Sequence, residues 1–147
     1  MAKFSVSVSS EINCSRETLA QFVLDVPNIP QWSSAFVAIR DFSGEPIGLG
    51  STWQAVSKFM GAEFVSDNEV IEFEEGRLCV LYVDGGAFTG TNTWTFDSTE
   101  DGRSVFTIRG QGEMKSFLTS LAIPLIRSQA QNQMRSDIQN MKAILEA

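Results

Sequence analysis

The hydrophobic period changes in the last third of the chain, and this change constrains the fold more than any other sequence feature. Over most of the chain, apolar residues recur at every second position, which is typical of strands with one buried face. From residue 129 onward a single apolar stripe repeats at spacings of four, three and four: Met134, Ile138, Met141 and Leu145. This spacing places the side chains on one face of a helix. The sequence therefore predicts strands followed by one long helix that packs on them.

Turn residues divide the earlier part of the chain into one strand, two short helices and six further strands. The first strand is expected over residues 3–10, and Ser15 suits the N-cap of a helix that runs to Val26. Pro27 and Pro30 break that helix, and residues 28–32 are expected to form a turn that leads into a second short helix. The further strands are predicted at residues 35–43, 50–59, 62–73, 77–84, 88–97 and 103–111. Because short turns join them, consecutive strands are expected to be antiparallel neighbours.

The long helix is expected to begin near Met114 or Lys115 and to be kinked or broken just before Pro124. The part that follows, about 23 residues at roughly 1.5 Å each, spans on the order of 34 Å. This length is enough to cross a sheet.

The chain has 147 residues, of which 43% are hydrophobic, so one domain over residues 1–147 with a single core is expected. Gly90 and Gly110 lie inside strand patterns and are the predicted points at which the sheet bends. The residues thus predict an α+β fold, in which a curved antiparallel sheet of about seven strands wraps one long helix.

Charge and composition exclude several classes of function. The net charge of −7 argues against a nucleic-acid partner and against adhesion to anionic membranes. The absence of histidine excludes Ser-His-Asp catalysis, Cys-His catalysis and the common zinc sites. Cys14 and Cys79 have neither metal nor redox spacing and are expected to be packing residues. We expect no metal, no cofactor, no membrane insertion and a cytoplasmic location.

Four segments and their order resemble one known superfamily. They are residues 12–19 (INCSRETL), 25–32 (DVPNIPQW), 48–53 (GLGSTW) and 92–96 (NTWTF), the last before the turn at Asp101-Gly102. In this order they resemble the SRPBCC or START-like helix-grip superfamily, which includes the birch pollen allergen. The branch that the chain looks closest to is the polyketide cyclase/dehydrase and lipid-transport family. The resemblance implies an internal cavity for a hydrophobic or aromatic ligand, but no particular reaction.

Aromatic side chains on several strands are candidates for the walls of such a cavity. The expected walls are Trp53, Phe59, Tyr82 and Trp94, with Asn92 and the Tyr82 hydroxyl as isolated polar contacts. Buried tryptophan and tyrosine need partners for their polar atoms, and a ligand is one source of them. Ordinary core packing is the alternative for each residue. Trp32, after the two prolines, is expected near the cavity mouth.

The upstream half of the long helix is expected to roof the cavity. Met134 continues the apolar stripe, and the small Ala130 leaves room below the helix. Arg127 or Gln131 would offer a polar anchor to a ligand. The alternative is that Arg127 points to solvent and the stripe simply ends.

Three classes of function remain open on these grounds. The first is a carrier or sensor that binds a small hydrophobic or aromatic ligand, such as a lipid, a polyketide or an isoprenoid-like molecule. The second is a metal-free enzyme of the cyclase, aromatase or dehydratase type, with Tyr82 or Asp84 as weak candidates for acid–base catalysis. The third is a protein-interaction module that uses residues 117–126. A monomer or a weak homodimer is expected.

Overall fold

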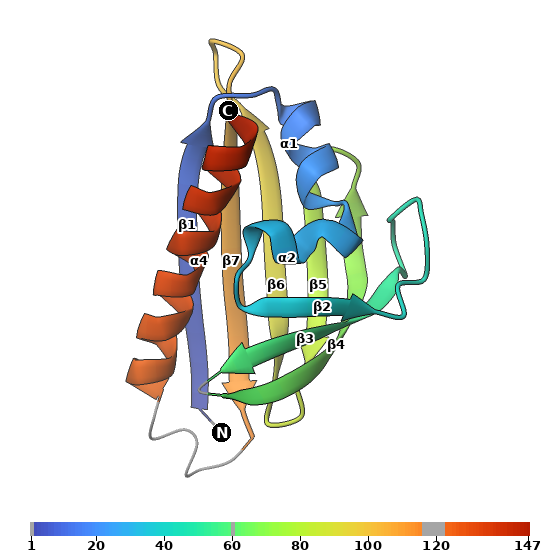
Figure 1. Ribbon diagram of the computed structural model, residues 1–147, viewed down its shortest axis with the longest axis vertical. Helices are drawn as coiled ribbons and strands as arrows, with labels where there is room; N and C mark the ends of the chain where they lie inside the picture. Colours follow the sequence, from blue (N-terminus) through green and yellow to red (C-terminus); the bar gives the residue numbers. More distant parts are fainter. Residues whose placement is uncertain (1, 60, 116–122) are drawn as a thin grey trace.

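The computed structural model describes residues 2–59, 61–115 and 123–147. Within these residues, seven antiparallel strands form one sheet in the order β1-β7-β6-β5-β4-β3-β2. The elements are β1 (Ala2–Ile12), α1 (Arg16–Val23), η1 (Val26–Asn28), α2 (Ile29–Trp32), β2 (Phe36–Arg40), β3 (Thr52–Phe59), β4 (Ala62–Glu74), β5 (Leu78–Asp84), β6 (Phe88–Ser98), β7 (Ser104–Met114) and α4 (Ile123–Leu145). Helices α1, α2 and α4 lie on the same face of the curved sheet (Figure 1). The predicted architecture is confirmed.

The short helices begin and end for local reasons. The Ser15 side chain caps α1 by accepting a hydrogen bond of 3.1 Å from the backbone N–H of Thr18. Helix α1 ends at Val23, three residues earlier than predicted, and the 3₁₀ turn η1 follows at Pro27. Helix α2 then carries Trp32 over the concave face of the sheet.

The end of β7 corrects the predicted start of the long helix. Met114 pairs with Ala2 of β1 and with Phe88 of β6, so β7 continues three residues beyond its predicted end. A strand that is paired on both sides gains hydrogen bonds along its whole length, and this pairing overrides the helical pattern. The helix that was predicted to begin near Met114 or Lys115 therefore does not include either of these residues. Residues 116–122 lie outside the described part of the chain.

The predicted kink or break just before Pro124 borders on residues 116–122, which lie outside the described part of the chain, and the described helix α4 runs from Ile123 to Leu145. Pro124 is the second residue of the helix. In the first helical turn the missing N–H of proline costs nothing, because backbone N–H groups there have no partner inside the helix.

Two glycines let other groups approach the sheet closely. A side-chain carbon at Gly90 would lie 2.1 Å from the carbonyl oxygen of Gln111, so glycine allows the backbones of β6 and β7 to come together. At Gly110 such a carbon would lie 3.1 Å from Cε of Met134. Gly90 thus makes room for the backbone of β7, and Gly110 makes room for the Met134 side chain of α4.

The C-terminal half of α4 closes a dense apolar core. Ile138 and Met141 are buried, while Met134 and Leu145 are partly buried against the same cluster, so the predicted stripe faces the sheet. Beneath them, Phe96 and Phe106 stack with ring centres 5.6 Å apart.

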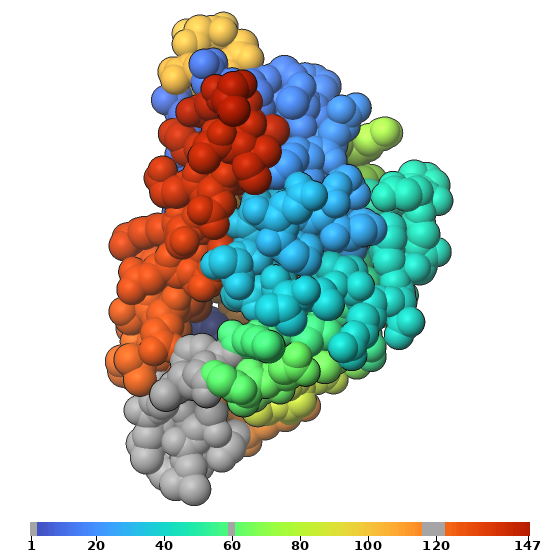
Figure 2. All heavy atoms as spheres, viewed as in Figure 1, coloured from blue at the N-terminus to red at the C-terminus, as the bar shows by residue number. Residues whose placement is uncertain are grey.

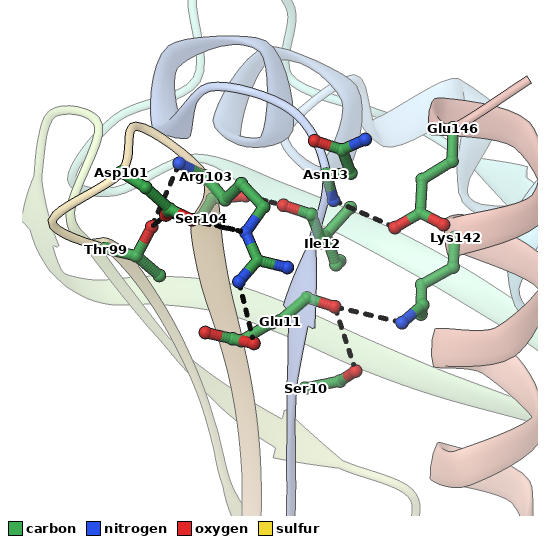
Figure 3. A network of polar contacts seen from close by, with 10 residues as sticks. All are labelled: Ser10, Glu11, Ile12, Asn13, Thr99, Asp101, Arg103, Ser104, Lys142 and Glu146. Atoms are coloured by element: carbon green, nitrogen blue, oxygen red, sulfur yellow. Dashed lines mark hydrogen bonds and ion pairs between the residues drawn. The ribbon is translucent and has the colours of Figure 1, made fainter.

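Polar contacts tie the end of α4 to the end of β1 (Figure 3). The backbone N–H of Asn13 donates to Glu146 Oε2 at 2.8 Å, and Lys142 Nζ donates to the carbonyl oxygen of Glu11 at 3.1 Å. Arg103, from the β6–β7 turn, forms an ion pair of 3.3 Å with the Glu11 carboxylate. These contacts fix the C-terminal end of the helix.

The close approach at Gly90 predicts a large cost for a single methyl group. Gly90→Ala should lower the free energy of unfolding by about 1–3 kcal/mol, because the methyl group would strike backbone atoms. Gly48→Ala is the matched control, since a side-chain carbon there meets nothing within 4 Å. Urea unfolding measures both variants. Equal stabilities for the two variants would contradict this account.

Candidate functional site

Asn92 and Trp94 lie side by side on the concave face of β6. In its row across the sheet, Asn92 stands between Gly110 of β7 and Leu81 of β5. The Trp94 row contains Ile108 and Cys79 on the same two neighbouring strands. Each of the two residues therefore brings polar atoms to an apolar part of the face.

Helix α2 places a second indole ring against Trp94. The rings of Trp32 and Trp94 meet edge to face, with centroids 6.3 Å apart and planes at 71°. Both side chains are almost completely buried, at 2% and 3% exposure. Asn140 of α4 donates a hydrogen bond of 3.4 Å to the Trp32 carbonyl oxygen and so links α2 to α4.

Three buried polar atoms in this region have no protein partner: Nε1 of Trp32, Nε1 of Trp94 and Oδ1 of Asn92. In an edge-to-face pair, at most one indole N–H can point at the ring of the other. A buried polar group without a partner costs roughly 1–3 kcal/mol. The protein alone therefore leaves unused hydrogen-bonding capacity on its concave face.

The N-terminal half of α4 covers the concave face beside these residues. Met134 lies over Gly110, which is the β7 neighbour of Asn92. Ala130 and Gln131, one turn before Met134, are half-buried. Among the described residues, no hydrogen bond joins α4 to another element before Gln133, which donates to Ser34 at 3.1 Å.

Figure 2 shows an opening beside this untied half of the helix. It lies between α4, drawn in orange, and the green segment of β3 and β4. Dark blue atoms of β1 are visible inside it, so the opening leads toward the concave face of the sheet.

The predicted position of Tyr82 is wrong. Cys79 and Leu81 are the buried residues of β5, and Tyr82 is 37% exposed on the convex face. Apolar residues occupy both faces of this strand, so alternation could not identify the inner one. The pairing of β5 with β6 identifies the inner face of β5, because Cys79 lies opposite the inward-facing Trp94. Asp84 shares the outer face with Tyr82 and accepts a hydrogen bond of 2.9 Å from the Gly86 N–H.

The other predicted wall and roof residues are spread over the molecule. Trp53 is buried on β3 but packs edge to face on Phe42, at 6.1 Å. Phe59 is the last residue of β3, and its side chain lies outside the described part. Arg127 is exposed and lines a groove at the outer edge of β1. The structure thus brings Trp32, Asn92, Trp94 and Met134 to the same inner region, but not Tyr82 or Arg127.

Two open grooves lie on the convex face. The larger, of about 540 Å³, runs from Ile71 of β4 across β5, β6, β7 and β1 to Arg127 of α4, and the smaller, of about 410 Å³, crosses β3, β4 and β5. Tyr82 lines both. Both grooves are open to solvent, whereas ligand sites are mostly enclosed. We therefore place the candidate site on the concave face.

Asp137 is a buried carboxylate that the sequence analysis did not identify. Its Oδ2 accepts a hydrogen bond of 2.7 Å from Ser33 Oγ, and its Oδ1 accepts one of 2.7 Å from Gln133 Nε2. Burial raises the pKa of Asp137, and the hydrogen bonds from Ser33, Gln133 and the Ser34 backbone oppose that rise in part. Together these contacts hold α4 against the residues after α2.

Cys79 is a packing residue. Burial raises the pKa of its thiol to about 12, so the nucleophilic thiolate is essentially absent at neutral pH. Among the described residues, no group of three or more Cys, Asp or Glu side chains is arranged to hold a metal ion. None of the described helices is both long and apolar enough to cross a membrane.

Solved structures share this fold over nearly the whole chain. A START superfamily protein from Mycobacterium smegmatis matches with a TM-score of 0.78 and 18% identity, over 97% of both chains. Major latex-like protein 151 from Panax ginseng matches with a TM-score of 0.72 and 14% identity, also over 97% of both chains. The Zhui aromatase/cyclase from Streptomyces sp. R1128 matches with a TM-score of 0.79 and 7% identity, over 99% of this chain and 94% of that one.

These likenesses define a START-like helix-grip fold. A sequence model of the polyketide cyclase / dehydrase and lipid transport family matches residues 3–146, and the chain belongs to that family. The family resemblance that the sequence analysis identified is confirmed. No sequence among the curated proteins matches the chain.

The raised pKa of Asp137 predicts how the stability of an Asp137→Asn variant depends on pH. The folded state holds the Asp137 proton more tightly than the unfolded state, so this group's contribution to stability is fully present at low pH. That contribution is lost as the pH rises from the ordinary value of 3.8 through the raised pKa. Urea unfolding at pH 4 and pH 8 should therefore show the stability difference shifting in favour of the variant at pH 8.

The control for this experiment is Asp97→Asn, which removes a carboxylate of the same kind from an exposed position. A shift of equal size in both variants would show that net charge, not burial of Asp137, causes the effect.

Proposed function

We propose that this protein binds a small hydrophobic ligand between the sheet and the N-terminal half of α4, as a carrier or a sensor. The observation that carries the proposal is the opening beside the untied part of α4, which leads toward the concave face of the sheet, the face on which the apolar surroundings of Trp94 lie. Met134 and the Trp32–Trp94 pair supply polarizable and aromatic contacts for an apolar molecule. Membership of a family described by cyclase, dehydrase and lipid transport functions supports the same class of ligand.

The structure gives less support to the other two classes. Tyr82 and Asp84, the candidates for acid–base catalysis, lie on the convex face, away from Trp94. Of the segment considered for protein interaction, residues 117–122 lie outside the described part. We therefore do not propose a cyclase or an interaction module.

Filling the space below α4 should block binding. We expect Ala130→Phe to weaken the binding of naphthalene by about 10-fold or more, because the added ring would occupy the half-buried side of the helix. Isothermal titration calorimetry measures the affinity, and thermal unfolding shows that the variant is folded.

Ala143→Phe is the matched control, because it makes the same change at an exposed position of the same helix. It should bind naphthalene as the wild type does. If the wild type binds no apolar probe, or if both variants bind equally well, the proposed site is wrong.

A further inference from the structure

The unpaired atoms on the concave face point to the chemical class of the ligand, and this inference rests on the proposed function. We infer that the ligand is an uncharged, largely apolar molecule with one hydroxyl group, which hydrogen-bonds between Asn92 and Trp94. The apolar body packs against the rows that contain Leu81 and Ile108, and the hydroxyl uses the polar atoms that the protein leaves unpaired.

The complementarity of donors and acceptors selects a hydroxyl group. Trp94 Nε1 can only donate a hydrogen bond, and Asn92 Oδ1 can only accept one. A hydroxyl does both, because it accepts through its oxygen and donates its proton. A ketone can only accept a hydrogen bond, so it would satisfy only the indole N–H of Trp94. A hydrocarbon has no polar atom and would satisfy neither group.

Asn92 and Trp94 are neighbours on one face of the sheet. Asn92 and Trp94 are two positions apart on β6 and project from the same face, so their Cα atoms are separated by about 6.7 Å. A ligand that lies along this face of β6 can therefore contact both side chains.

The Trp32 indole strengthens this preference for an oxygen. Its Nε1 is also buried and unpaired, and its ring contacts the Trp94 ring. At most one of the two indole N–H groups can donate to the π face of the other ring. At least one indole donor is therefore left for a ligand.

The charges of the region exclude an anionic ligand. Asp137 is the only charged side chain that is buried among the described residues, and it lies one helical turn from Met134. Arg127, which would be the natural partner of a carboxylate, is exposed. A carboxylate placed between Asn92 and Trp94 would therefore be buried without a cation, which is costly.

Three probes of nearly equal size test this inference: naphthalene, 1-naphthol and 1-naphthoate, titrated into the full chain at pH 7 by calorimetry. 1-Naphthol should bind about 10-fold more tightly than naphthalene, as expected for a net gain near 1.4 kcal/mol from satisfying buried groups. 1-Naphthoate should bind more weakly than naphthalene. Equal affinities for naphthalene and 1-naphthol, or tightest binding of 1-naphthoate, would overturn the inference.

Two variants locate the preference at the proposed atoms. Asn92→Leu removes the acceptor and Trp94→Phe removes the donor, and each should bring the affinity ratio of 1-naphthol to naphthalene close to one. Trp53→Phe is the matched control, because Trp53 is equally buried but its Nε1 is not among the unpaired atoms. It should keep the wild-type ratio. A ratio that survives both site variants would show that the hydroxyl binds elsewhere.

The affinity ratio of 1-naphthol to naphthalene separates a failure of this inference from a failure of the proposed function. If the wild type binds none of the three probes, the proposed function fails. If it binds naphthalene, and Ala130→Phe weakens that binding as expected, but 1-naphthol gains nothing, only the inference about the hydroxyl fails. Because the ratio compares two ligands on the same variant, partial loss of stability does not change its meaning.

Discussion

The close approach of β6 and β7 at Gly90 is the constraint on which the rest of the structure depends. No side chain fits there, since its first carbon would lie 2.1 Å from a backbone oxygen of the neighbouring strand. The strands continue in register beyond this point, so β7 stays paired with both β1 and β6 to its end at Met114. The concave face, the inward direction of Asn92 and Trp94, and the seat of Met134 on Gly110 all follow from this pairing.

Most of the fold could be predicted because its signals are local. Alternation of apolar residues marked the strands, Ser15 marked the first helix, and the stripe through Met141 marked the last one. The end of β7 could not be predicted, because Gly112 and Met114 acquire strand structure from partners at the other end of the chain. The inner face of β5 could not be predicted either, since both of its faces are apolar and only pairing with β6 selects one.

The candidate site was predictable where two inward-facing residues share a strand. Asn92 and Trp94 alternate with threonines on β6, and that alternation correctly assigned their face. The contact between Trp32 and Trp94 depends on how α2 packs, for which the sequence has no periodic signal. Asp137 was missed for the same reason: it lies beside the apolar stripe of α4, and only the position of Ser33 shows that it is buried.

The uneven attachment of α4 has a kinetic consequence. Near its C-terminus the helix is held by hydrogen bonds and by a packed core. Among the described residues, no hydrogen bond joins the helix to another element before Gln133, and the contact of the next residue, Met134, with Gly110 is dispersive. Lifting this front segment breaks no polar link among the described residues. For the proposed ligand, loading and release would require the Met134 thioether to leave its contact with Gly110, and ionic strength should have little influence on a dispersive contact of this kind.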